Sequence, residues 1–124
     1  MQKKILIIDA DPNMRHRIAT SMRQLGHNPV QASNGYEGID KTVTEHPDLV
    51  LMDLELPDLG SIEVAKRIRE NYRTAKVPII GHSAWGLEYL RNEALRAGFS
   101  DFLARPVAPE RLAQVIERFT NTSG

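Results

Sequence analysis

The sequence predicts a single α/β domain built on a parallel β-sheet, and three observations support this. Short apolar runs alternate five times with amphipathic stretches of about helix length. The first run, residues 4–8, is continuous and rich in β-branched residues, which is typical of a strand covered on both faces. The chain has 124 residues, enough to bury one hydrophobic core but not two. Strict alternation of this kind favours right-handed crossovers, with helices on both faces of the sheet.

The five expected strands are the short apolar runs, taken in chain order. They cover residues 4–8, 28–32, 48–52, 77–80 and 99–103. The second run is the weakest, because a proline and two amides interrupt it. The third run ends directly before Asp53.

The five expected helices follow from one-sided apolar spacing and from capping residues. They cover residues 12–25, 35–45, 60–72, 87–97 and 109–119. Asp11 followed by Pro12 is typical of a helix N-cap and first helical position. The domain is therefore expected to span residues 1–120, with a loose tail at 121–124.

The composition argues against several classes of function. Sixteen basic residues balance sixteen acidic ones, so neither nucleic acid nor an anionic membrane is an expected partner. The absence of cysteine excludes disulfides, thiolate metal sites and cysteine nucleophiles, and fits a reducing, cytoplasmic location. The first apolar run is too short for a signal peptide or a membrane span.

Chemically active side chains follow the expected strands. Asp9 follows the first strand, Asp53 the third, Ser83 lies near the end of the fourth, and Arg105 near the end of the fifth. Ligands of parallel sheets bind outside the carboxyl ends of the strands, so these groups are expected to converge there. Clustered carboxylates bind Mg²⁺, and a carboxylate can attack phosphorus to give an acyl phosphate. Each acid alone could equally be a solvated strand end or a helix cap; the convergence of all four groups favours phosphoryl chemistry.

Four segments give the chain its resemblance to the receiver domain of two-component response regulators, over nearly its whole length. They are Ile7-Ile-Asp-Ala-Asp-Pro12, Pro47-Asp-Leu-Val-Leu-Met-Asp-Leu-Glu-Leu-Pro57, Pro78-Ile-Ile-Gly-His-Ser-Ala84 and Ala97-Gly-Phe-Ser-Asp-Phe-Leu-Ala-Arg-Pro106. The resemblance implies a flavodoxin-like (βα)5 fold with strand order 2-1-3-4-5. It also implies a signalling module rather than an enzyme.

The resemblance assigns roles to particular residues. It implies that Asp53 is the phosphoacceptor and that Asp9, Asp53 and the backbone carbonyl of Glu55 hold Mg²⁺. It makes Ser83 the switch hydroxyl and Phe102 the aromatic that changes rotamer with it. Strand alternation places Phe102 and the next residue on opposite faces, and an exposed aromatic beside the last helix would suit a partner surface. Arg105-Pro106 corresponds to a Lys-Pro step whose peptide bond is typically cis in the family.

Four features depart from the family pattern, and one of them is Gly60-Ser61, where Asp-Gly is usual after the acceptor loop. Ala10 replaces an acid that normally contacts the metal, so Mg²⁺ is expected to bind weakly. Asp11 could lean in to replace that acid, although Asp-Pro at a helix start is an ordinary cap. Arg105 stands in place of lysine, and its longer, forked guanidinium changes the geometry offered to phosphate. Trp85 is bulky at a position that borders the route of water to the phosphate.

Three functions are compatible with these residues. In the first and favoured one, a histidine kinase or phosphotransfer protein phosphorylates Asp53, and the face formed by the fourth helix, fifth strand and fifth helix signals to a downstream partner. In the second, the domain is a pseudo-receiver that binds a partner constitutively, without phosphate. The third is a small phosphotransfer hydrolase, which is disfavoured because Glu55 stands where its general-acid aspartate belongs. The four histidines, at 16, 27, 46 and 82, show no metal-ligand spacing and are expected on the surface or in the core.

Overall fold

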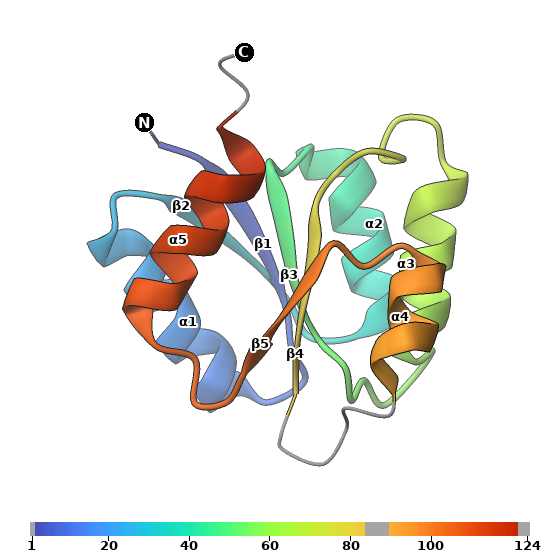
Figure 1. Ribbon diagram of the computed structural model, residues 1–124, viewed down its shortest axis with the longest axis horizontal. Coiled ribbons are helices and arrows are strands. Elements are labelled where there is room, and N and C mark those ends of the chain that lie inside the picture. The colour runs from blue at the N-terminus through green and yellow to red at the C-terminus, as the bar shows by residue number, and fades with distance from the viewer. Residues whose placement is uncertain (1, 84–89, 122–124) are drawn as a thin grey trace.

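The computed structural model describes residues 2–83 and 90–121, and it has a sheet between two helical layers (Figure 1). Five parallel strands form the sheet in the order β2-β1-β3-β4-β5, which confirms the predicted α/β class and strand order. The strands are β1 (Lys4–Ile8), β2 (Asn28–Ala32), β3 (Leu49–Asp53), β4 (Ile79–Ser83) and β5 (Asp101–Ala104).

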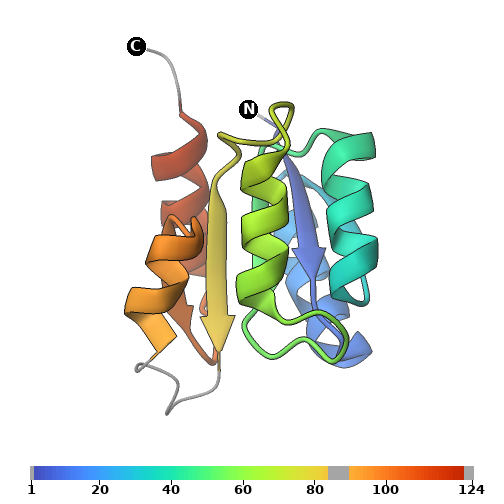
Figure 2. The ribbon, with the colours of Figure 1, turned by 90° about the vertical axis from the view of Figure 1, so that its right-hand side faces the viewer.

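The helices cover both faces of the sheet (Figures 1 and 2). They are α1 (Pro12–Gln24), α2 (Gly35–Glu45), α3 (Ser61–Glu70), α4 (Arg91–Ala97) and α5 (Pro109–Thr120). The first and last helices lie on one face, and the other three lie on the opposite face. The expected start of the fourth helix, near residue 87, and residues 122–124 of the expected tail lie outside the described residues.

Three strands differ in their bounds from the sequence prediction: β3 lies one residue later than expected, and β4 and β5 each begin two residues later. The fifth strand begins at Asp101 rather than Phe99, because the backbone N–H of Phe99 donates to Ala94 and completes the end of α4. The fourth strand begins at Ile79 and continues to Ser83. Val50 in β3 already donates its N–H to the carbonyl of Pro78, so pairing starts one residue before the strand itself.

The sheet separates two hydrophobic clusters. One cluster packs β1, β3 and β4 against α3 and α4, and the other packs them against α1 and α5. In the edge strand β5, Leu103 is buried in the α1/α5 cluster, whereas Phe102 packs against the α3/α4 cluster. The predicted alternation of these two residues is therefore correct, but the prediction of an exposed aromatic beside α5 is wrong. Phe102 is half-buried and stacks on Phe99, with ring centroids 5.5 Å apart.

The register places the ends of the central strands at one edge of the sheet. Ile8 pairs with Met52, so the residues that follow, Asp9 and Asp53, emerge side by side. Asp53 in turn pairs with His82 of β4. No helix in the described part of the chain is long and apolar enough to cross a membrane.

Candidate functional site

Two buried carboxylates form the base of the site. Asp9 is fully buried and Asp53 is 6% exposed. One oxygen of each is held by backbone two residues later: Asp9 Oδ1 accepts from the N–H of Asp11, and Asp53 Oδ1 accepts from the N–H of Glu55, both at 2.9 Å. These bonds fix both carboxylate planes and leave the two Oδ2 atoms for other partners.

Arg105 supplies the positive charge between the acids. Its Nη2 lies 2.9 Å from Asp53 Oδ2 and 3.7 Å from Asp9 Oδ2. Since both oxygens contact the same nitrogen, they lie within ~7 Å of each other, close enough to share one hydrated cation. The side chain is carried by the segment after β5, where the Arg105-Pro106 peptide bond is cis, as the resemblance implied.

His82 is the neighbour that the sequence did not single out. It is fully buried at the position of β4 that pairs with Asp53. Its Nδ1 accepts a hydrogen bond from Arg105 Nε at 3.1 Å, and its Nε2 lies 3.5 Å from Asp9 Oδ2. The acceptor role of Nδ1 places the imidazole proton on Nε2, which is close to Asp9 but has no hydrogen-bond partner among the described residues. The sequence does contain a signal for this residue. Strand alternation places His82 on the same face of β4 as Ile80, and β4 pairs with the strand that carries Asp53.

Burial and charge set the protonation of the site. Burial raises the pKa of Asp9, and the charge of Asp53 raises it further; the Asp11 hydrogen bond and the Arg105 charge act in the opposite direction. Burial, helped by the charge of Arg105, lowers the pKa of His82 to about 3. The imidazole is therefore neutral near pH 7, and Arg105 is the cation of this network.

The positions around Asp9 differ in what they contribute. Asp11 is exposed and its carboxylate accepts from the N–H of Asn13 at 3.0 Å, so in this structure it caps α1. Ala10, between the two acids, is exposed and offers no oxygen ligand from its side chain. Arg15 of α1 donates to the carbonyl of Asp9 at 2.7 Å and holds this loop to the helix.

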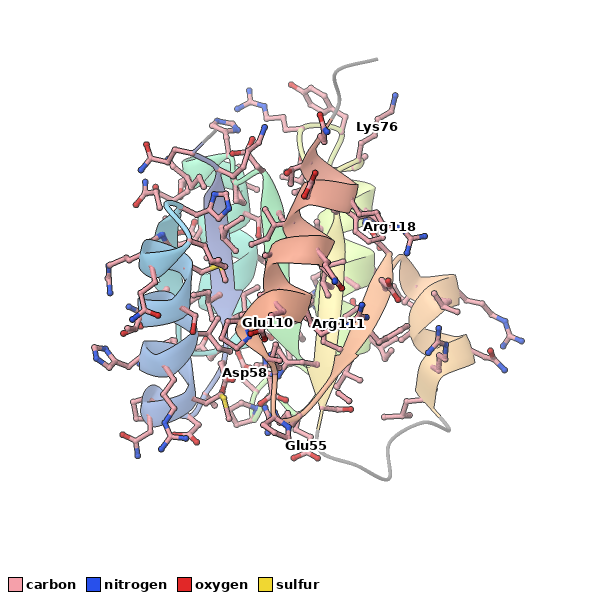
Figure 3. The ribbon with its side chains drawn as sticks, turned by 60° about the vertical axis from the view of Figure 1, so that its left-hand side comes forward. Glu55, Asp58, Lys76, Glu110, Arg111 and Arg118 are labelled. Atoms are coloured by element: carbon pink, nitrogen blue, oxygen red, sulfur yellow. The ribbon has the colours of Figure 1, made fainter. Side chains whose placement is uncertain are left out.

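The remaining predicted residues lie at the same edge or next to it. Ser83 ends β4 and is half-buried. Glu55 is exposed where the strands end, at the opposite end of the molecule from Lys76 (Figure 3). Phe102 lies on the other side of the sheet from His82, with the guanidinium of Arg91 5.3 Å from its ring centroid. Trp85 lies outside the described residues.

The residues of the site fit a divalent cation, although with few protein ligands. Asp9 Oδ2 is buried and has no hydrogen-bond partner among the described residues, which is unfavourable for an anion unless a cation is near. In the described part of the chain, no group of three His, Cys, Asp or Glu side chains could hold a metal. The donors that remain are two carboxylates and a backbone carbonyl, a set that suits Mg²⁺ because this ion retains several waters.

Comparisons with known proteins show the family to which the chain belongs. The response regulator receiver domain model matches residues 5–117. The chain is 30% identical to the chemotaxis protein CheY of Thermotoga maritima over 119 residues, which cover 95% of this chain and 98% of CheY. It is also 30% identical to the phosphate regulon transcriptional regulatory protein PhoB of Pseudomonas aeruginosa, over 98% of this chain but 53% of PhoB.

A solved structure gives the same result at the level of the fold. The receiver domain of a sensor histidine kinase from Pseudomonas aeruginosa, which has a magnesium ion coordinated in its active-site cleft, has a TM-score of 0.90 and 27% identity to this chain. The match covers 98% of this chain and all of that domain. The chain belongs to the response regulator receiver domain family.

Proposed function

We propose that this domain is a phosphorylation switch in a two-component system, with Asp53 as the acceptor. The observation that supports this most directly is the contact of 2.9 Å between Arg105 Nη2 and Asp53 Oδ2. The other oxygen of Asp53 is held by the backbone of Glu55, so the carboxylate presents one fixed oxygen beside a cation. A positioned carboxylate oxygen beside a cation suits attack on phosphorus, because the cation can then pair with the phosphoryl oxygens.

The proposed reaction transfers a phosphoryl group from a phosphohistidine of a kinase or a phosphotransfer protein. Asp53 Oδ2 attacks phosphorus, the P–N bond to the donor imidazole breaks, and the imidazole takes up a proton as it leaves. Arg105 exchanges its contact with Asp53 for contacts with the phosphoryl oxygens. The hydroxyl of Ser83 donates a hydrogen bond to one phosphoryl oxygen. Phe102 then follows Ser83, and the face of α4, β5 and α5 presents the change to a protein partner.

Mg²⁺ is the cation proposed for this site, held by Asp9, Asp53 and the carbonyl of Glu55. When bound, it neutralises charge on the transferred group. The carboxylates of Asp9 and Asp53 are each held by a backbone hydrogen bond and are almost completely shielded from solvent. This shielding strengthens their attraction for a cation. We propose that binding is weak, because Ala10 supplies no carboxylate.

Intact-mass measurement tests the switch. The native chain, incubated with acetyl phosphate and Mg²⁺, is expected to gain one phosphoryl group slowly and only at high Mg²⁺ concentration. Asp53→Asn, which keeps the shape of the side chain and removes the nucleophilic charge, should gain none. The proposal fails if the native chain is never modified while the double variant Ala10→Asp, Arg105→Lys is.

A second candidate is a pseudo-receiver that binds a partner without phosphate. The observation in its favour is that Arg105 contacts Asp9 as well as Asp53, so the protein's own cation already lies between the acids. In that case Asp53→Asn would leave partner binding unchanged, whereas the switch predicts that phosphate is needed for binding. Pull-down of the partner with native chain and with Asp53→Asn, each with and without phosphodonor, separates the two functions.

A further inference from the structure

Two different nitrogens of the Arg105 guanidinium make separate contacts. Its terminal Nη2 faces Asp53 and Asp9, and its Nε, on the stem side, donates to His82 Nδ1 at 3.1 Å. A lysine has no donor at the position of Nε, because its three N–H groups all leave the terminal nitrogen. A lysine whose terminal nitrogen faces the acids therefore has no second nitrogen with which to donate to His82, whereas arginine makes both contacts at once.

The position of His82 fixes the direction of that contact. The imidazole is fully buried in β4, and its Nε2 lies 3.5 Å from Asp9 Oδ2. With the proton on Nε2, Nδ1 has a free lone pair directed at Arg105. A buried acceptor of this kind is costly unless a donor satisfies it, so the imidazole favours the orientation of Arg105 in which Nε faces it.

That orientation has a consequence for the two acids. Nη2 is 2.9 Å from one carboxylate and 3.7 Å from the other, so the positive charge lies between them. A divalent cation bound by Asp9 and Asp53 would need the same two Oδ2 atoms or the space beside them. Two cations in this nearly dry space repel each other strongly.

We propose that His82 is a positioning residue that holds Arg105 across Asp9 and Asp53, so that the guanidinium and a divalent cation compete for the two carboxylates. The inference deepens the proposed function, since it concerns the metal dependence of the same site. It also gives one reason for the pairing of histidine 82 with arginine 105 in this chain: His82 Nδ1 accepts from Arg105 Nε, and this contact places the guanidinium as an internal cation beside the acids.

A double-mutant cycle with Mg²⁺ tests this. Mg²⁺ affinity is measured by isothermal titration calorimetry for the native chain, His82→Leu, Arg105→Lys and the double variant, with folding checked by circular dichroism. His82→Leu removes the acceptor at similar volume and should tighten Mg²⁺ about tenfold, since a hydrogen bond to a charged group contributes at least that factor. Arg105→Lys should tighten Mg²⁺ as well. In the double variant, loss of His82 should add nothing further, because it acts only through Arg105.

His82→Asn is the matched control. Its Oδ1 stands near the position of Nδ1 and can accept from Arg105 Nε, but it has no group at the position of Nε2. This variant should keep the weak affinity of the native chain, which separates the contact with Arg105 from the contact with Asp9. Equal tightening by His82→Leu in both the arginine and the lysine background would overturn the inference, as would the failure of every variant to bind Mg²⁺.

A measurement on the native chain covers the case in which the variants do not fold. In ¹⁵N NMR, His82 should be the tautomer with its proton on Nε2, and the Nε–H of Arg105 should exchange slowly with solvent. Saturating Mg²⁺ should abolish that protection, and unchanged protection would overturn the inference. The outcome is independent of phosphate: a chain that shows the coupling but never gains a phosphoryl group contradicts only the proposed function, and the reverse result contradicts only this inference.

Discussion

Asp9 lies in surroundings that disfavour its own charge. It is fully buried, Asp53 lies near it, and its Oδ2 has no hydrogen-bond partner among the described residues. Arg105 Nη2 and His82 Nε2, at 3.7 and 3.5 Å, approach that oxygen from two sides but are long for hydrogen bonds. Burial accordingly raises the pKa of Asp9. The affinity of the site for cations therefore depends strongly on any charge added beside this residue.

Ala10→Asp adds such a charge and should tighten Mg²⁺. A carboxylate at close range, at an effective dielectric near 20, contributes a few kcal/mol of attraction, offset in part by repulsion from Asp9 and Asp53. We expect a gain of roughly tenfold to a thousandfold in affinity. Calorimetric titration with Mg²⁺ measures it, with Ala10→Asn as the neutral control of the same shape. Equal affinities of the two variants would show that charge at this position is not what limits binding.

The sequence predicted the acids of the site better than its cation. Asp9 and Asp53 follow apolar strands directly, and the rule for strand ends is sufficient to bring them together. The contact of Arg105 with both acids depends on side-chain length and rotamer, which the pattern of residues does not encode. His82 was assigned only to the surface or the core, because its role depends on the pairing of β4 with β3 rather than on any motif.

At the scale of elements, a glycine in β4 leaves room for two aromatic rings that pack against the strand. Gly81 lies on the face opposite His82, and a Cβ placed there would come within 3.0 to 3.1 Å of the rings of Phe99 and Phe102. The stack of these rings fills the space between β4, β5 and α4. The glycine therefore determines how deeply Phe102 can pack.

Gly81→Ala should push Phe102 outward and destabilise the domain by about 1–3 kcal/mol, the usual cost of overpacking. Urea denaturation measures the loss. The matched control is the same substitution in a Phe102→Leu background, where the smaller, more flexible side chain should accommodate the methyl group. Equal losses in both backgrounds would indicate that Phe99 or the strand backbone, rather than Phe102, meets the new methyl group.

A second connection between elements joins the loop after Asp53 to α2. Asp58 accepts from the backbone N–H groups of Gly35 and Tyr36 at 2.8 and 3.0 Å, in the first turn of α2. Asn34 caps the same helix through the N–H of Glu37. The loop that carries Glu55 is therefore held to the N-terminus of α2 by the hydrogen bonds that Asp58 accepts.

Asp58→Ala should lower the free energy of unfolding by about 1 kcal/mol, as for the loss of a helix cap. Slight burial raises the pKa of Asp58, but the hydrogen bonds from Tyr36, Gly35 and Leu59 outweigh it and lower the pKa overall. The carboxylate form therefore stabilises the fold above the unfolded pKa, and this stabilisation is lost as the pH falls through the folded pKa. The difference in stability between native chain and variant should shrink in acid, which chemical denaturation at neutral and acidic pH would detect; Asp58→Asn is the control for shape.

The elements themselves were largely predictable. Apolar runs and caps located five strands and five helices, because each segment's local preference agrees with its place in the fold. The deviations lie at element boundaries: β3 is shifted by one residue, β4 and β5 begin two residues later than expected, and α3 ends two residues earlier. The exposure of Phe102 was predicted wrongly because alternation gives the face of a strand but not what covers it.

The whole molecule is a sheet with a hydrophobic cluster on each face. Its one fully buried histidine, His82, lies between the α1/α5 cluster and the acidic site. His82 thus connects the stability of the entire domain to pH. Its folded pKa is lowered to about 3, far below the value of 6.5 that it has when exposed. Between these two values the unfolded chain binds a proton that the native chain does not, so stability falls as the pH falls through 6.5.

We expect the native chain to lose about 2 kcal/mol of unfolding free energy through His82 alone between pH 7 and pH 5. His27, whose pKa is also lowered by burial, contributes in the same direction, so the quantity to measure is the difference between the native chain and His82→Leu. Urea denaturation at both pH values, with EDTA present so that no divalent cation intervenes, gives that difference. The native chain should lose more stability than the variant. Equal losses would mean that the imidazole takes up its proton over the same pH range in the folded chain as in the unfolded chain, so that burial does not keep it neutral.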